Sequence, residues 1–368
     1  MAAISLRNLH KSFGDFTAVR DTTLDLEDGR FVVLLGPSGC GKTTTLRMIA
    51  GLEYPNSGKI ELDGVDVTYR RPRERDVAMV FQLFALYGHM NVRENLEFPL
   101  KNERLPRVEI ERRIEVAARM LRIESILEAR IGKLSGGDRQ RVALGRAIVR
   151  QPKAFLMDEP LGTLDAEFRE AMCVELRRLH QRLRTTTVFV THDQNEAMAL
   201  ADRVVVMNRG DVLQADTPDA VYNHPATMFV AGFIGRPPMN FVPVDGGIAV
   251  GQAQVAARGA VIAVPRSAAI AQAAVLGVRP EHVDLDGTGS WRGKVTQTEY
   301  FGAHWIVTVE TAAAHVKVRA RKGACPAVGD HVGLRPRTGR VVLFDRATEH
   351  LLPSQRSLAP VAKEVAYG

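Results

Sequence analysis

A glycine-rich segment at residues 36–44, Gly-Pro-Ser-Gly-Cys-Gly-Lys-Thr-Thr, constrains the fold of this chain more than any other part of its sequence. It follows the apolar run Phe31–Leu35, which is typical of a buried parallel strand, and it opens a helical pattern at 44–51. Glycines allow backbone N–H groups to crowd around an anion, and a helix N-terminus adds the positive end of its dipole. The segment therefore predicts an α/β core with a phosphate-binding loop between a strand and a helix.

Two side chains of this loop indicate what the phosphates belong to. The ammonium group of Lys42 can neutralise outer phosphates, and the hydroxyl of Thr43 can reach a Mg²⁺ ion. The expected ligand is a nucleoside triphosphate. The residues expected to surround its phosphates are Ser38, Gly39, Cys40, Gly41, Lys42, Thr43 and Thr44.

A second chemical pattern is the apolar run Ala154–Met157, which ends in the acids Asp158 and Glu159. Two carboxylates at the end of a buried strand are unfavourable unless a cation or a water network compensates them. Mg²⁺ would supply that compensation. We therefore expect Asp158 to face the metal and Glu159 to act as general base for a hydrolytic water beside the γ-phosphate.

The segment 134–140, Leu-Ser-Gly-Gly-Asp-Arg-Gln, lies between these two motifs and precedes an amphipathic pattern. Ser135 suits an N-cap, and Gly136 and Gly137 leave backbone N–H groups exposed. The segment predicts a second helix end that can bind an anion, although by itself it is also an ordinary helix start.

Further apolar runs and helical spacings organise the first part of the chain as an α/β domain over 1–235. Apolar residues recur every three or four positions between 108 and 121, which predicts a helical subdomain inserted at about 86–150. The additional strands are expected at Val77–Phe81, Thr187–Val190 and Arg203–Met207. Another helix with a core-packing stripe is expected from Phe168, Met172, Leu176, Leu179 and Leu183.

A second domain is expected over 236–368. The helical pattern Thr227–Ile234 is followed by Gly235-Arg236-Pro237-Pro238, which breaks a helix and is typical of a linker. Residues 240–352 alternate in strand fashion with glycine and proline between the runs. This part predicts an all-β, barrel-like module.

Composition excludes several classes of protein. With 45% hydrophobic and 25% charged residues, the chain is neither disordered nor collagen-like. No apolar run approaches the length of a membrane span, and the N-terminus carries charge where a signal peptide would be apolar, so we expect a cytosolic chain. The net charge of +7 includes no basic arm, and three widely spaced cysteines predict neither a disulfide framework nor a zinc site.

These motifs together resemble the ATP-binding subunits of ABC transporters, in which they occur in the same order. The matching segments are the loop 36–44, Gln82, the signature 134–140, the acidic strand 154–159, the loop 161–165 and His192. Flanking segments are similar to the maltose-type carbohydrate importers over about residues 4–310. These segments are 191–198, 229–235, Met239-Asn240 and 276–281.

The resemblance implies a P-loop ABC-type nucleotide-binding domain with an inserted helical subdomain, followed by an OB-like (TOBE/MOP) domain for regulation or dimerisation. It also implies that two cassettes, identical or different, sandwich two ATP molecules. In that arrangement Phe13 stacks on adenine, Gln82 contacts Mg²⁺ or water, and His192 holds the γ-phosphate and the attacking water. Ser135, Gly136 and Gly137 reach the ATP of the opposite chain, and Asp165 links the two sites.

The implied activity is ATP hydrolysis that drives import of a carbohydrate, a polyol or a related solute such as glycerol or glycerol phosphate. The implied partners are a second ATPase subunit, two transmembrane permease subunits and, indirectly, a periplasmic or extracellular solute-binding protein, with no nucleic acid. The implied location is peripheral, on the cytoplasmic face of a bacterial inner membrane.

Some residues depart from the family pattern. Asp138 stands where the family usually has glutamine, and it places an acid near a neighbour's nucleotide. Leu83, Phe84 and Gly88 replace residues of the stretch that lines the permease-docking cleft. These departures leave open an alternative, namely a regulatory or low-activity cassette that pairs with a second, different ATPase subunit.

Cys40 lies among the N–H groups of the phosphate loop, two positions before Lys42. Nearby positive charge lowers the pKa of a thiol. We therefore expect a lowered pKa and rapid alkylation of Cys40, with protection by bound MgATP.

Overall fold

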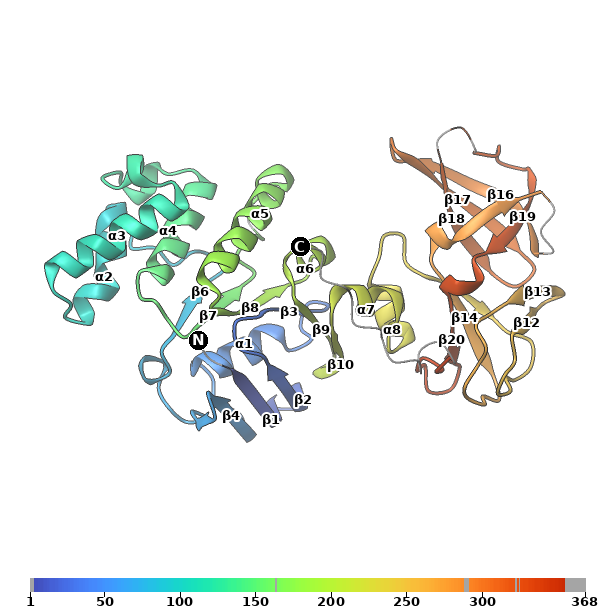
Figure 1. Ribbon diagram of the computed structural model, residues 1–368, viewed down its shortest axis with the longest axis horizontal. Coiled ribbons are helices and arrows are strands. Elements are labelled where there is room, and N and C mark those ends of the chain that lie inside the picture. Colours follow the sequence, from blue (N-terminus) through green and yellow to red (C-terminus); the bar gives the residue numbers. More distant parts are fainter. Residues whose placement is uncertain (1–2, 163, 288–290, 322, 324, 355–368) are drawn as a thin grey trace, which may run out of the picture. The chain divides into compact units, whose positions relative to one another are not determined.

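The computed structural model of the chain describes residues 3–354, except 163, 288–290, 322 and 324 (Figure 1). The chain divides into two compact units between Pro218 and Asp219. Helix α8 (Met228–Phe233) thus groups with the C-terminal unit. The sequence-based boundary after residue 235 differs from this division and stays a prediction. In the part of the chain that is described, no helix is both long and apolar enough to span a membrane.

The N-terminal unit begins with a four-stranded antiparallel sheet of order β2-β1-β4-β5. Its strands are β1 (Ile4–Phe13), β2 (Phe16–Leu26), β4 (Ser57–Leu62) and β5 (Val65–Asp66). These strands are not among those predicted from the sequence. Their signal is the period-two alternation of apolar residues, as at Ile4 and Leu6 or at Leu24 and Leu26, all of which are buried.

The second sheet is the α/β sheet that the sequence predicts. Its order is β10-β9-β3-β8-β7-β6, with parallel pairing throughout except for the antiparallel edge strand β10. Its central strands are almost wholly buried, as expected for a parallel sheet covered on both faces. The strands are β3 (Phe31–Leu35), β6 (Val77–Val80), β7 (Ala154–Asp158), β8 (Thr186–Thr191), β9 (Arg203–Asn208) and β10 (Asp211–Asp216).

Helix α1 (Lys42–Ala50) packs between the two sheets (Figure 1). Its buried side chains Leu46 and Ile49 share one hydrophobic cluster with Ile4 of the antiparallel sheet and Val32 of the parallel sheet. The opposite face of the parallel sheet is covered by helices that include α5 (Ala166–Leu183) and α6 (Gln194–Leu200). The sheet is therefore a central layer, which fixes the position of the loops at its edge.

The predicted helical subdomain is confirmed. Helices α2 (Val92–Asn102), α3 (Arg107–Leu121) and α4 (Gly136–Ile148) contact one another, and Figure 1 shows them together at one end of the unit. Gly145 of α4 permits this close packing, because a Cβ there would lie 2.9 Å from a methyl group of Leu96.

The apolar stripe of α5 is only partly a core stripe. Met172, Leu176 and Leu179 are buried. Phe168 is 56% exposed, so the prediction that it packs into the core is wrong. Phe168 lies in the first turn of α5, next to the start of α4 rather than over the sheet.

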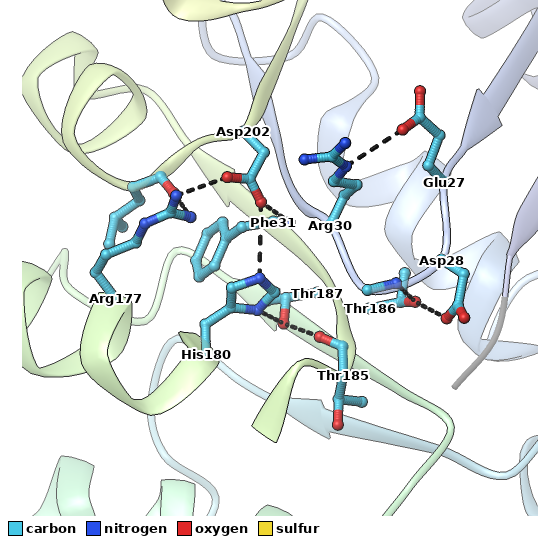
Figure 2. Close-up of polar contacts among 12 residues, drawn as sticks. Glu27, Asp28, Arg30, Phe31, Arg177, His180, Thr185, Thr186, Thr187 and Asp202 are labelled. Carbon is cyan, nitrogen blue, oxygen red and sulfur yellow. Dashed lines mark hydrogen bonds and ion pairs between the residues drawn. The ribbon is translucent and has the colours of Figure 1, made fainter. Parts of the chain in front are cut away.

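A polar cluster joins α5 to the amino ends of the parallel strands (Figure 2). Oδ1 of Asp202 accepts a hydrogen bond from Arg177 Nη2 at 2.6 Å. Its Oδ2 accepts from the Phe31 backbone N–H at 2.8 Å and lies 3.6 Å from Nε2 of His180. Burial lowers the pKa of His180. Burial alone would raise the pKa of Asp202, but the bonds from Arg177 and Phe31 lower it overall. The cluster lies at the opposite ends of the strands from the phosphate loop.

The C-terminal unit carries β11 to β20, and every strand pair in it is antiparallel among the described residues. Its sheets have the orders β11-β14-β20, β12-β13 and β15-β19-β16-β17-β18, and share one hydrophobic core. This arrangement confirms the predicted all-β module. The strands are β11 (Asn240–Pro243), β12 (Gln254–Ala257), β13 (Ala260–Ala263), β14 (Ala274–Val278), β15 (Val283–Asp286), β16 (Trp291–Tyr300), β17 (His304–Thr311), β18 (His315–Arg321), β19 (His331–Pro336) and β20 (Val341–Asp345).

Candidate nucleotide site at the edge of the parallel sheet

The loop after β3 is folded closely around the side chain of Lys42. The ammonium group donates hydrogen bonds to the carbonyl oxygens of Gly36 and Pro37, at 2.8 and 2.9 Å, and the residue is 4% exposed. A Cβ at Gly36 would lie 2.2 Å from the carbonyl oxygen of Met207, so no larger residue fits there. The loop therefore holds a cation at the end of the sheet and leaves little room for other side chains.

Helix α1 begins directly in this loop. Its N-cap, Gly41, has a φ of +105° and has no side chain that could accept from the first-turn N–H groups. The first turn contains no acidic residue that would compete for the positive end of the helix. Both features favour an anion at this helix end, as the sequence predicts.

Asp158, at the end of β7, meets Thr43 at the start of α1. The Thr43 hydroxyl donates to Oδ1 of Asp158 at 2.8 Å, and Asp158 is 8% exposed. Burial raises the pKa of Asp158, and the bond from Thr43 opposes this only in part. A buried carboxylate next to a hydroxyl is a donor set of hard oxygens, which suits Mg²⁺ completed by phosphate oxygens and water.

Glu159 and His192 form a pair at the ends of β7 and β8. Nδ1 of His192 lies 3.2 Å from Oε2 of Glu159, and the His192 side chain is 58% exposed. Glu159 has a φ of +43°, and its N–H donates to the carbonyl oxygen of Val190 at 3.0 Å. The turn directs a carboxylate and an imidazole toward the same exposed place.

Gln82 lies in an exposed turn after β6. Its Nε2 would lie 3.7 Å from a Cβ at Gly162, and Oε2 of Glu159 would lie 3.9 Å from that same point. The Gln82 amide and the Glu159 carboxylate therefore both lie beside Gly162, at distances that are ordinary contacts. Gly162 belongs to the loop 161–165, in which Thr163 lies outside the described residues.

The structure thus brings together Lys42, Thr43, Gln82, Asp158, Glu159 and His192. They follow β3, β6, β7 and β8, which are neighbours in the parallel sheet. The carboxyl ends of parallel strands share one edge of the sheet, and this is where α/β proteins bind ligands.

Other predicted site residues lie on other elements of the unit. Phe13, at the end of β1, is 48% exposed, and Nζ of Lys11 lies 4.8 Å from the centroid of its ring. Asp165 is the N-cap of α5 and accepts from the Phe168 N–H at 3.0 Å. Ser135 is the N-cap of α4, and a Cβ at Gly136 would lie 3.8 Å from Leu164.

Asp138 makes contacts that the sequence does not reveal. The Ser135 hydroxyl donates to Oδ2 of Asp138 at 2.7 Å and accepts from the Asp138 N–H at 3.1 Å. Arg141 lies 3.6 Å from the other carboxylate oxygen. The Asp138 carboxylate therefore takes up the hydrogen bond of the Ser135 hydroxyl, at the helix end where the sequence predicts a bound anion.

The expectation of a lowered pKa for Cys40 is wrong. Cys40 is 3% exposed, and its burial raises the pKa of the thiol even though Nζ of Lys42 lies 3.9 Å from the sulfur. The loop that concentrates positive charge also excludes water from the thiolate. Burial and the raised pKa both predict slow alkylation of Cys40.

Sequence reasoning also missed residues that hold the site in place. Arg146 of α4 donates to the carbonyl oxygens of Phe84 and Ala85, at 3.2 and 2.8 Å, and so attaches the segment after Gln82 to the helix that begins at Ser135. Buried Glu196 accepts from the Thr191 hydroxyl at 2.6 Å, next to His192. No local motif indicates the role of Arg146, because its contact joins parts of the chain that are distant in sequence; Glu196 is only five residues from Thr191, within the segment 191–198 that resembles the importers.

Comparisons with known proteins agree with this geometry. The "ABC transporter" family matches residues 19–162, and the "TOBE domain" family matches residues 276–344. An "sn-glycerol-3-phosphate import ATP-binding protein UgpC 2" of Rhizobium johnstonii is 54% identical over 79% of this chain and 80% of its own length. The protein named UgpC of Cereibacter sphaeroides, described in the same terms, is 45% identical over 95% of this chain and 99% of its own.

A solved structure shows the same fold in the N-terminal unit. The dimeric ATP-binding cassette MJ0796, in a post-hydrolysis state with ADP and Pi, matches with a TM-score of 0.52 and 30% identity, over 58% of this chain and 98% of its own. The matching family, the relatives that align over most of their length and the fold of the solved cassette all agree with the cluster of side chains at the sheet edge. The chain therefore belongs to the ABC transporter family, as one of its import ATP-binding subunits, and is an ATPase.

Proposed function

We propose that this chain hydrolyses MgATP to power the uptake of a small polar solute through partner permeases. The observation that carries the proposal is the convergence of a lysine loop, a buried carboxylate and the Glu159–His192 pair at one edge of the parallel sheet. The names of the relatives make sn-glycerol 3-phosphate the first solute to test. Glycerol, other polyols and carbohydrates are the related candidates.

The loop 38–44 and Lys42 are proposed to hold the ATP phosphates. The Lys42 ammonium group would exchange its two loop carbonyls for phosphate oxygens, which are stronger acceptors because they are charged. Thr43, Asp158 and Gln82 would hold Mg²⁺, and the bound ion would neutralise phosphate charge. Phe13, exposed at the end of β1, is the candidate to stack on adenine.

Glu159 is proposed as the general base. Its carboxylate stands beside the imidazole of His192, so it can accept a proton from a water that the imidazole orients. The buried contacts of Thr191 and Glu196 hold the turn that carries His192. This pair supports hydrolysis rather than binding alone.

Ser135, Gly136 and Gly137 are proposed to complete the nucleotide site of a second cassette. Their helix end is exposed, and in the family that the chain resembles this segment reaches the ATP of the opposite chain. A facing subunit, identical or different, would bring the two together. Asp165, at the start of the neighbouring helix α5, is the candidate to link the two sites.

The segment after Gln82 is proposed to dock on the permeases. Leu83 is 79% exposed, and Arg146 attaches the segment to α4. A movement of the docked segment would therefore reach both Gln82 and, through Arg146 in its last turn, helix α4. The working assembly would contain two transmembrane permease subunits and, indirectly, a solute-binding protein, with this chain peripheral on the cytoplasmic face of a bacterial inner membrane and no nucleic acid.

Reconstitution in proteoliposomes tests the proposal. Proteoliposomes that contain the purified chain, its permeases and the binding protein should take up labelled sn-glycerol 3-phosphate only when MgATP is present on the side of the membrane where this chain lies. Glu159→Gln should abolish uptake, while Glu170→Gln, at an exposed position on α5, should leave it unchanged. Uptake that continues with Glu159→Gln would contradict the role of Glu159 as general base. Uptake of a carbohydrate but not of sn-glycerol 3-phosphate would show that the transported solute is a carbohydrate.

A further inference from the structure

The C-terminal unit contains a hollow of about 650 Å³ to which the proposed transport cycle assigns no role. The five-stranded sheet curves until its edge strands, β15 and β18, approach each other without pairing. The hollow lies along this seam, between Val283 and Leu285 on one side and Val318 and Ala320 on the other. An open seam leaves backbone hydrogen-bonding groups unpaired along both edges.

The free edge of β18 presents N–H groups to this seam. The side chain of Asn240 accepts from the Lys317 N–H at 2.7 Å and donates to the Lys317 carbonyl oxygen at 2.8 Å, so the backbone of Lys317 points away from β17. Antiparallel ladders alternate residue by residue, and the register of β17 with β18 has no shift. The N–H groups of Arg319 and Arg321 therefore point to the same free edge.

Three arginines and two carboxylates line the hollow, but both carboxylates are already engaged. Asp284 accepts two bonds from Arg337, at 2.7 and 3.1 Å, and this pairing holds the pKa of Asp284 below its usual range. Glu281 accepts from the Tyr222 hydroxyl at 2.5 Å, and its charge interacts with that of the buried guanidinium of Arg279. Two guanidinium groups, those of Arg319 and Arg321, thus have no carboxylate within 4.0 Å among the described residues.

Arg319 is held in place by a neutral partner. Its Nη2 lies 3.3 Å from Nδ1 of His304, which must accept because a guanidinium has no acceptor. The contact orients the arginine and leaves its charge uncompensated. His304 also stacks on Phe301, with 5.7 Å between ring centroids, so the wall that carries Arg319 is itself supported.

We propose that this arginine hollow, formed by His304, Arg319, Arg321 and Arg337, binds a small phosphate monoester. Two uncompensated guanidinium groups balance the charge of a phosphoryl group at neutral pH, and their forked donors match its oxygens. The outward N–H groups of β18 add further donors. The hollow is far larger than a phosphate ion and lies in the size range of organic ligand sites, which favours an ester over the free ion.

Isothermal titration of the full chain tests this site. Because the Lys42 loop also accepts phosphate, the titrations use a Lys42→Ala background and three probes: sn-glycerol 3-phosphate, inorganic phosphate and glycerol. We expect saturable binding of the ester with a Kd below about 1 mM, weaker binding of inorganic phosphate, and none of glycerol. Arg319→Ala combined with Arg321→Ala should weaken ester binding at least ten-fold, because both uncompensated charges are lost.

Arg335→Ala is the matched control. Arg335 is an exposed arginine on β19 that pairs with Asp286 at 3.2 Å and does not line the hollow, so its loss should leave the affinity unchanged. Thermal unfolding of each variant checks that the unit remains folded. Absence of saturable binding, or equal affinity in the Arg319/Arg321 variant, would overturn the site, and tighter binding of inorganic phosphate would overturn the choice of an ester. MgATP binding by the unmodified chain is measured separately, so failure of this site is distinguishable from failure of the proposed ATPase site.

Discussion

Replacing Asp138 with asparagine should make two copies of this chain dimerise more tightly around MgATP. The carboxylate holds the Ser135 hydroxyl at 2.7 Å, at the helix end proposed to meet a facing nucleotide. Asparagine keeps the shape and an acceptor for that hydroxyl but removes the charge. The substitution therefore separates electrostatic repulsion from loss of the helix cap.

The size of the effect follows from Coulomb's law. The Ser135 hydroxyl has a single proton, so a facing phosphate oxygen would have to take that bond from Asp138. With both acceptors about 3 Å from the hydroxyl oxygen, the phosphate oxygen would lie roughly 5 Å from the Asp138 carboxylate. Two unit charges at that separation repel by about 0.8 kcal/mol in water and about 3 kcal/mol at a partly buried surface. The Asp138 side chain is 31% exposed, so we expect about 1–2 kcal/mol per site, a five- to thirty-fold change in affinity.

The assay is sedimentation equilibrium in a Glu159→Gln background, which prevents turnover, with MgATP at low and at high ionic strength. The gain from Asp138→Asn should shrink as salt screens the repulsion. Glu170→Gln, an exposed acid on α5, should change nothing. An unchanged or weaker dimer with Asp138→Asn would refute the reasoning and leave Asp138 as a helix-capping residue only.

Three further predictions concern the N-terminal unit. Arg75 is 2% exposed and donates to four backbone carbonyls around the end of α1, those of Met48, Ile49, Thr68 and Arg70. Arg75→Ala should therefore lower the free energy of unfolding, measured by urea denaturation, by about 3–5 kcal/mol. A loss below about 1 kcal/mol would contradict this capping role. Cys40 should resist alkylation at pH 7 in the folded chain without nucleotide, because burial raises its pKa, and rapid labelling at this position would show that the loop is open to solvent. Burial lowers the pKa of His180 below 6.5, so the unfolded chain binds a proton at this residue more tightly than the folded chain. This group should not affect the stability above about pH 7, and the stability should fall as the pH drops below about 6.5. A His180→Gln variant should therefore show a smaller decrease in urea midpoint between pH 7.5 and 5.5.

The parallel sheet and the chemical residues after its strands could be predicted from the sequence, because buried parallel strands are continuous apolar runs and phosphate chemistry needs glycine, lysine and acids at fixed places. Strand β3 matches its predicted range of Phe31–Leu35. The antiparallel sheet could not be predicted in the same way, because strands such as Ile4–Phe13 are half-buried and interrupted by register shifts, which weakens their alternation.

The remaining features depend on tertiary contacts. Glycine and lysine near Cys40 indicate a positive environment, but its burial under Gly36 and against Lys42 decides the pKa. The spacing of α5 places Phe168 on an apolar face, yet the face at that turn meets the start of α4 instead of the sheet. Likewise, the Ser135–Asp138 bond follows from local spacing only once the helix is known to begin at Ser135.

The central claim is that MgATP joins two copies of this chain and that Glu159 is needed for hydrolysis but not for the joining. The most direct measurement is the mass of the Glu159→Gln chain in solution with MgATP, with MgADP and without nucleotide, alongside phosphate release. We predict a dimer with MgATP only, together with loss of phosphate release relative to the unmodified chain. A monomer at saturating MgATP, an equal dimer under all three conditions, or unchanged phosphate release would contradict the account.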